Sequence, residues 1–133
     1  MKRSLLLLSA TAAAALALAP TASAKLSLGT SSDDTLVGTD ERDFIYGRGG
    51  NDTMAGNGAS DFLFGHRGDD TASGDAGRDA LWGGHGNDTL WGGNGNERLW
   101  GGPGVDTLYG DGEVDDPDDG TRSSRSRPTE RST

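Results

Sequence analysis

The sequence predicts an all-β solenoid, and three observations support this fold class. A nine-residue unit repeats nine times from Gly29 to Tyr109 without insertion or deletion. Every copy begins with glycine, has an acidic residue at its sixth position and an apolar residue at its eighth. A longer period of two copies overlies the first, because the seventh position is threonine in copies 1, 3, 5, 7 and 9 only. A solenoid whose coil has two unlike sides accounts for this alternation.

Each copy predicts a turn followed by a short strand. Positions one to six are rich in glycine, which favours a tight turn, and positions seven to nine form a three-residue strand. Side chains alternate along a strand, so the eighth residue points inward while the seventh and ninth point outward. The predicted inward column comprises Leu36, Ile45, Met54, Leu63, Ala72, Leu81, Leu90, Leu99 and Leu108. We call the turns of odd-numbered and even-numbered copies the odd and even loops.

The first 24 residues (1–24) resemble a signal peptide of the general secretory (Sec) route. Lys2 and Arg3 precede an apolar run from Leu5 to Ala19, and residues 22–24 match the small-x-small cleavage pattern. An uncleaved membrane anchor is the alternative, but a run of about 15 residues is short for a span of about 20. We therefore expect a secreted, extracellular bacterial protein without a membrane span after signal removal. Residues 25–28 would be a short leader before the repeats at 29–109.

The segment 110–133 departs from the repeat. Residues 110–115 predict a partial closing turn, so the segment begins as a degenerate cap. Residues 121–133 are rich in serine, arginine and threonine, with almost no apolar residue to bury. Such a composition predicts a disordered C-terminal tail.

Charge and composition exclude several classes of function. The chain has 21 Asp and Glu against 12 Lys and Arg, two of which lie in the signal segment. This acidic surface disfavours nucleic acid as a partner. The chain has no cysteine, so no disulfide stabilises it. No H-E-x-x-H or G-x-S-x-G motif occurs, and we expect the protein not to be an enzyme.

A cation is the expected source of stability. One inward apolar residue in each copy buries little surface, and the stacked sixth-position carboxylates would repel one another. Calcium is a hard cation that takes six to eight oxygen ligands, and carboxylates of successive coils can reach one ion between them. Zinc prefers imidazole or thiolate, and the two histidines, His66 and His85, occupy different loop positions. We expect both to be exposed loop residues.

The clearest copies, residues 83–91 and 101–109, read G-G-x-G-x-D-x-U-x, where U is a large apolar residue. This pattern resembles the RTX, or haemolysin-type, calcium-binding nonapeptide repeat. The resemblance implies a right-handed parallel β-roll (β-solenoid) of nine repeats, with calcium between the turns on both sides. It also implies a chain that is disordered without calcium and folds on binding it outside the cell.

The resemblance implies two columns of calcium ligands. Odd-loop side chains would be Asp34, Asp52, Asp70, Asp88 and Asp106, and even-loop side chains Asp43, Asp61, Asp79 and Glu97. Backbone carbonyls would come from around Gly47, Gly49, Gly65, Gly83, Gly84, Gly86, Gly101, Gly102 and Gly104. Up to seven ions would fit between the stacked loops. The odd face is favoured, because the loop 38–43 lacks the inner glycines and Glu97 is one methylene longer than aspartate.

The predicted function is that of a secreted calcium-binding protein. The alternative is an extracellular adhesion or matrix module in which calcium is purely structural. Such a module would bind a cell-wall or matrix polysaccharide, or a protein, through an outward aromatic stripe of Tyr46, Phe64, Trp82 and Trp100. A purely structural use of the same stripe would be to stiffen the sheet. The odd threonine column also raises ice binding, which the irregular and bulky ninth positions argue against.

Overall fold

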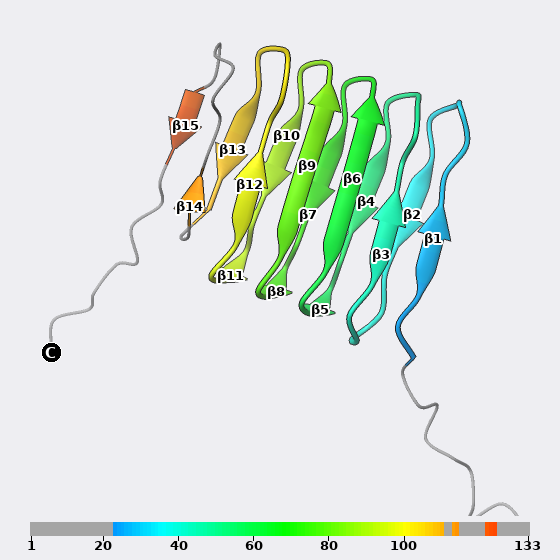
Figure 1. Ribbon diagram of the computed structural model, residues 1–133, viewed down its shortest axis with the longest axis vertical. Coiled ribbons are helices and arrows are strands. Elements are labelled where there is room, and N and C mark those ends of the chain that lie inside the picture. The colour runs from blue at the N-terminus through cyan, green and yellow to red at the C-terminus, as the bar shows by residue number, and fades with distance from the viewer. Residues whose placement is uncertain (1–22, 111–112, 115–121, 125–133) are drawn as a thin grey trace, which may run out of the picture.

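The fold is a parallel β-solenoid of about five turns, seen in a computed structural model that describes residues 23–110, 113–114 and 122–124. No helix occurs among these residues. The coils stack side by side, with one sheet in front of the other and turns at the top and bottom (Figure 1). The odd loops lie at the top of this view and the even loops at the bottom.

Alternate copies of the repeat contribute to opposite sheets. The even sheet has the order β1 (Leu26–Leu28), β3 (Phe44–Tyr46), β6 (Phe62–Arg67), β9 (Ala80–His85), β12 (Arg98–Trp100) and β14 (Glu113–Val114). The odd sheet has the order β2 (Thr35–Val37), β4 (Thr53–Ala55), β7 (Thr71–Ser73), β10 (Thr89–Trp91), β13 (Thr107–Tyr109) and β15 (Arg122–Ser124). A small third sheet joins the even loops through β5 (Gly58–Ala59), β8 (Ala76–Gly77) and β11 (Asn94–Gly95).

The register confirms that one coil contains two copies of the repeat. Strands are parallel, and each residue pairs with its equivalent two copies further along the chain, as Tyr46 does with Phe64. All nine predicted three-residue strands are present at positions seven to nine of their copies. The eighth-position side chains form the core, each 1% exposed or less from Ile45 to Leu108. Leu36 is only partly buried, because β2 is the edge strand of its sheet.

Both ends of the repeat region extend further than the sequence predicts. The leader at 25–28 contains β1, which pairs with β3 and places Ser27 at the inward position, 7% exposed. The segment expected to be disordered contains Arg122–Ser124, which pairs with β13 out of step with the repeat. Glu113–Val114 pairs likewise with β12. Exposed backbone groups of the last coil accept further strands whatever their side chains, which explains the difference. The rest of the predicted tail, and the signal segment up to residue 22, lie outside the described residues.

The glycine pattern follows from two left-handed positions in each turn. In copies 3 to 9 the second and fourth residues all have positive φ, including the non-glycine residues Arg48, Asn57, Ala59, His66 and Asp75. At the fourth position the coils also approach closely. A Cβ on Gly68 would lie 1.8 Å from the carbonyl oxygen of Gly50 in the preceding odd loop. Within copies 1 and 2 no residue has positive φ, so these two turns have a different shape.

Candidate metal centre

The sixth-position carboxylates form two buried columns, one at each end of the coils. Eight of the nine are 1% exposed or less, namely Asp43, Asp52, Asp61, Asp70, Asp79, Asp88, Glu97 and Asp106. Asp34, in the first odd loop, is half-buried. The structure therefore brings each predicted ligand side chain into line with those of the neighbouring coils on its own face.

One oxygen of most of these carboxylates joins two coils. The backbone N–H of Asp52 donates to Oδ1 of Asp70 at 2.8 Å, and Asp70 donates in the same way to Asp88 at 2.8 Å. The even column repeats the pattern, with the N–H of Asp43 donating to Oδ1 of Asp61 at 2.7 Å. These bonds orient each side chain and aim its second oxygen away from the bond.

The second oxygen has no partner along most of both columns. Among the described residues, buried side-chain oxygens without a hydrogen bond include Oδ2 of Asp52, Asp61, Asp70, Asp79 and Asp88, and both carboxylate oxygens of Glu97. A buried, unpaired carboxylate oxygen is costly in free energy unless a cation or a donor satisfies it. The columns therefore have the chemistry of a cation site, with hard oxygen donors only.

Backbone carbonyls border the same spaces. A Cβ built on Gly65 would lie 2.2 Å from Asp70 Oδ2 and 2.5 Å from the carbonyl oxygen of Gly83. At Gly47 the corresponding distances are 2.3 Å to Asp52 Oδ2 and 3.0 Å to the carbonyl oxygen of Gly65. Most of the first-position glycines thus leave a small space that a side chain would fill, lined by a carboxylate and a carbonyl oxygen.

The other predicted carbonyl positions have different surroundings. The carbonyls of Gly84 and Gly86 lie against the next odd loop, where a Cβ on Gly102 or Gly104 would be 2.4 or 1.7 Å away. The Gly101 carbonyl accepts the N–H of Gly84 at 2.8 Å. Gly49 lines an open hollow on the surface.

Oxygen chemistry favours calcium over zinc in these columns. In the described part of the chain, no three His, Cys, Asp or Glu side chains gather around one point. An ion between two coils would therefore rely on two carboxylates supplemented by backbone carbonyls, a donor set that calcium accepts. His66 and His85 are exposed, as expected from their loop positions.

In copies 1 and 2, a threonine in the same loop donates hydrogen bonds to the sixth-position carboxylate. The N–H and Oγ1 of Thr30 donate to Oδ2 of Asp34 at 2.6 and 2.9 Å. In the next loop, the N–H and Oγ1 of Thr39 donate to Oδ2 of Asp43, the hydroxyl at 3.1 Å. The sequence pointed to the first even loop only through its missing glycines. The informative signal was threonine at position two of these two copies, which no later copy has.

A second ladder, which sequence reasoning missed, runs through the fifth positions of the odd loops. Here the N–H of each coil donates to the side chain of the preceding coil, from Asn51 to Asp33 at 2.7 Å and from Asp69 to Asn51 at 2.9 Å. It continues with Asn87 to Asp69 at 2.8 Å, and ends with Val105 to Asn87 at 2.9 Å. The alternation of Asp and Asn at this position was the available signal. The two ladders run in opposite directions and lock the odd loops together.

Burial sets the protonation behaviour of the columns. Desolvation raises the pKa of Asp88 to about 7, and those of Asp61 and Asp79 to about 6. The neighbouring carboxylates raise these pKa values further, while the backbone hydrogen bond lowers them. Desolvation likewise raises the pKa of Asp52 and Asp70. Protons and cations therefore compete for the same oxygens near neutral pH.

The predicted aromatic stripe is a ladder of stacked rings. Tyr46 and Phe64 stack with centroids 4.8 Å apart, Phe64 and Trp82 at 4.5 Å, and Trp82 and Trp100 at 4.5 Å. Their planes are within 7° of parallel. The ring faces therefore cover one another along the stack, which stabilises the sheet.

Comparison with known families agrees with this geometry. Among the described residues, no helix is long and apolar enough to cross a membrane. No curated protein matches the chain. The family model of the RTX calcium-binding nonapeptide repeat (4 copies) matches residues 28–63, 64–96 and 91–116, which together make up more than half of the chain. The chain therefore belongs to the family of RTX calcium-binding nonapeptide repeat proteins.

Proposed function

We propose that this protein is secreted and that its roll folds on binding calcium outside the cell. The observation that carries the proposal is the pair of buried carboxylate columns, in which Oδ2 of Asp52, Asp61, Asp70, Asp79 and Asp88 lacks a partner. Calcium would supply the positive charge that these oxygens lack, and it accepts carboxylate and carbonyl ligands in flexible geometry. Membership of the RTX family supports the choice of ion.

We infer five calcium sites where the sequence predicts up to seven. Thr30 and Thr39 already satisfy Asp34 and Asp43, so the gaps beside these two carboxylates have less need of an ion. Three spaces between successive odd loops remain, between Asp52 and Asp70, between Asp70 and Asp88, and between Asp88 and Asp106. Two spaces between successive even loops remain, between Asp61 and Asp79 and between Asp79 and Glu97. Three sites would then lie on the odd face and two on the even face, which keeps the odd face favoured.

Calcium-dependent folding follows from the balance of burial and repulsion. The described core is a single column of inward apolar residues on each side, and one of its members is only an alanine, Ala72. Without a cation, the roll would have to bury carboxylates one coil apart, which raises their pKa values as described. The unfolded chain leaves these groups in water, so it is favoured until calcium is present.

Secretion is supported by the segment before the roll. Residues 1–24 have the pattern of a Sec signal peptide. The backbone N of Lys25 lies 2.5 Å from Oδ1 of Asp43, and Ala24 and Lys25 are both exposed. Cleavage after Ala24 would leave an α-ammonium group at this point. That charge would pair with the Asp43 carboxylate at the first-coil end of the even column.

The alternative of an adhesion module with an aromatic binding stripe receives less support. Sugars bind aromatic side chains mainly through the ring faces, and the ladder covers these faces with neighbouring rings. The RTX repeat is typically a structural module, not a catalytic one, and we propose no enzymatic role.

Circular dichroism during a calcium titration of residues 25–133 tests the proposal. We expect a cooperative coil-to-β transition with a midpoint of roughly 10⁻⁴–10⁻³ M, the range of extracellular calcium modules. Magnesium at the same concentrations should not replace calcium, because it prefers tight octahedral sites. A β-sheet spectrum that persists in chelator, or a transition that magnesium produces equally well, would contradict calcium-dependent folding. Isothermal titration would then count the ions.

A further inference from the structure

We propose that the odd-loop end of the roll binds a sugar residue that carries one sulfate or phosphate group. The site is a cationic hollow, which we define by Arg48, His66, Arg67 and His85. Arg67 and His85 are register partners in β6 and β9, and Arg48 belongs to the preceding odd loop. The four residues line an open hollow of about 330 Å³.

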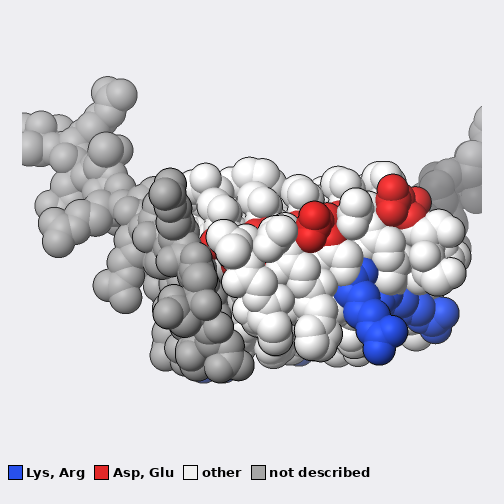
Figure 2. All heavy atoms as spheres, turned by 90° about the horizontal axis from the view of Figure 1, so that it is seen from above, with Lys and Arg blue, Asp and Glu red and all other residues white. Residues whose placement is uncertain are grey.

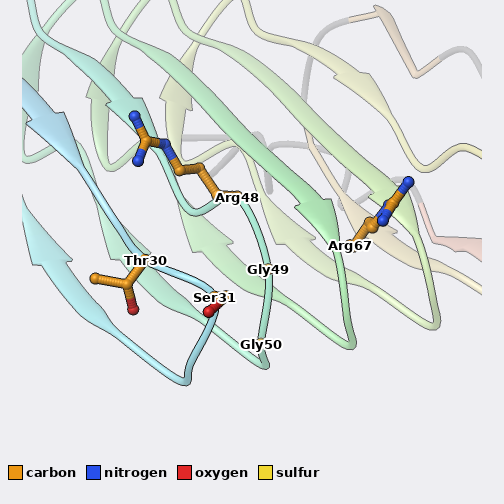
Figure 3. A pocket seen from close by; sticks show the side chains of 6 residues that line it. All are labelled: Thr30, Ser31, Arg48, Gly49, Gly50 and Arg67. Carbon is orange, nitrogen blue, oxygen red and sulfur yellow. The ribbon is translucent and has the colours of Figure 1, made fainter.

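A larger hollow adjoins the first and shares both arginines. Its volume is about 640 Å³, and it is lined by Thr30, Ser31, Arg48, Gly49, Gly50 and Arg67 (Figure 3). Binding sites for small molecules commonly have volumes of roughly 300–1,000 Å³. The lining contains guanidinium groups and the exposed Ser31, and it contains no carboxylate side chain. The hollow therefore suits a ligand with both an anionic group and hydroxyl groups.

Within the odd loops, Lys and Arg residues occur only at the hollow. Arg48 and Arg67 are the only lysine or arginine residues in the five odd loops. Figure 2 views this end of the roll, and shows the Lys and Arg atoms gathered at one edge, apart from the Asp and Glu atoms. Both arginines are exposed, and within the described part of the chain neither makes a salt bridge. Their charges are available to a ligand.

Arg48 and His66 occupy backbone positions that favour glycine. Arg48 and His66 occupy the second loop position with φ of 80°, a left-handed conformation that favours glycine. Later odd loops have Gly84 and Gly102 at the same position. Left-handed backbone costs a residue with a Cβ on the order of 1 kcal/mol. Binding therefore offers one reason for arginine and histidine at positions where glycine would fold more easily.

Electrostatics points the same way, and this step rests on the proposed calcium function. The arginines lie in the loops that would hold the odd column of calcium ions, so their charges would repel those ions. An oxyanion bound at either guanidinium group would reduce this repulsion. The binding of the anion and the binding of calcium would then favour one another.

The chemistry of the hollow narrows the class of ligand. Arginine offers a planar fork of N–H donors that matches sulfate, phosphate and carboxylate groups. In Figure 3 the two arginine side chains extend in different directions from successive loops, so they would flank a ligand instead of converging on a small ion. The excess of acidic residues over the whole chain repels densely charged polymers. A sugar residue with a single anionic group offers an oxyanion to arginine, is large enough to lie between the two side chains, and has a low charge.

The test is a titration of the ¹⁵N-labelled protein with glucose 6-sulfate, followed by two-dimensional NMR. We expect saturable shifts of the amide signals of Ser31, Gly49 and Gly50. Glucose should produce no shifts, and sodium sulfate should produce weaker binding at the same amides. Equal affinity for sodium sulfate and glucose 6-sulfate would overturn the sugar part of the proposal. Absence of saturable shifts at these amides would overturn the site itself.

Two double variants control for general charge effects. R48Q/R67Q removes the hollow's permanent charges, while R42Q/R78Q removes the same charge from exposed arginines in the even loops. We expect about tenfold weaker binding in the first variant, as for loss of a charge-assisted hydrogen bond, and little change in the second. Equal weakening in both would contradict a localised site. Titrations use whichever calcium condition gives a β-sheet spectrum, so failure of calcium-dependent folding would not be confused with failure of this site.

Discussion

The backbone N–H of Asp70 donates to Oδ1 of Asp88, one coil further along the roll, at 2.8 Å. The same carboxylate leaves its Oδ2 buried and without a partner. One side chain therefore joins two coils with one oxygen and presents the other to a cation. Repetition of this arrangement along both columns couples the stacking of coils to the binding of ions.

Replacement of Asp88 by asparagine separates these two roles. The Asp88→Asn amide can still accept the N–H of Asp70 through its oxygen, but it places an uncharged NH₂ group where Oδ2 would face an ion. Because Asp88 borders two odd gaps, we expect the loss of two calcium ions together, measured by isothermal titration. Asp34→Asn is the matched control, since Thr30 already satisfies Asp34. Equal stoichiometry in wild type and Asp88→Asn would argue against shared ligands.

The hydrogen bonds from Thr30 to Asp34 and from Thr39 to Asp43 should stabilise the first two turns without metal. We expect Thr30→Val and Thr39→Val each to lower the free energy of unfolding by about 1 kcal/mol, the typical net worth of a hydrogen bond. Both variants keep the backbone N–H and the shape of the side chain. Thr53→Val is the control, because Thr53 is an exposed strand residue. Denaturant unfolding at saturating calcium measures the difference. A loss of unfolding free energy no larger than that of Thr53→Val would show that these hydrogen bonds do not stabilise the turns.

Close coil contacts should make the fourth-position glycines irreplaceable. A Cβ at Gly68 would lie 1.8 Å from the Gly50 carbonyl oxygen, and φ is 120°. We expect Gly68→Ala to destabilise the calcium-loaded roll by about 3 kcal/mol or more, from overpacking and backbone strain together. Gly49→Ala is the matched control, since its nearest neighbours are 3.9 Å away. Similar calcium midpoints for the two variants, measured by circular dichroism, would show that the contact is not limiting.

Acid should partly replace calcium. Burial raises the pKa of Asp88 to about 7 and those of Asp61 and Asp79 to about 6 in the metal-free roll, above the ordinary value of 3.8. The folded state therefore holds more protons than the unfolded chain. Its metal-free stability rises as pH falls through about 7 and 6, and is lost as pH rises through the same range.

Two measurements check this dependence. In chelator, the β-sheet signal should increase as pH is lowered from about 8 to about 5, because protonation removes the buried charges. The midpoint of calcium binding should move to higher calcium concentration as pH is lowered over the same range, because protons compete with calcium for the carboxylate oxygens. A metal-free spectrum independent of pH would mean that the carboxylates do not oppose folding of the roll.

Much of the fold could be predicted from the sequence because its period is strict. Glycine at position one and an apolar residue at position eight specify turn and strand independently in every copy, and nine copies reinforce one register. The predicted inward column from Leu36 to Leu108 and the alternation of sheets are confirmed. The strand Arg122–Ser124 was missed, because it depends on backbone groups of the preceding coil and not on its own side chains.

By itself, the sequence determined the two-copy coil, the inward apolar residues and the carboxylate columns, because these follow from local periodicity. Only the tertiary structure decided how each carboxylate is used. Stacking sets which donors reach Oδ1 and Oδ2, so that Thr39 closes Asp43 while Oδ2 of Asp61 stays without a partner. Stacking also gathers Arg48 and Arg67 into one hollow, although they belong to different coils. Contacts between coils depend on turn shape and side-chain direction, which a linear pattern does not encode.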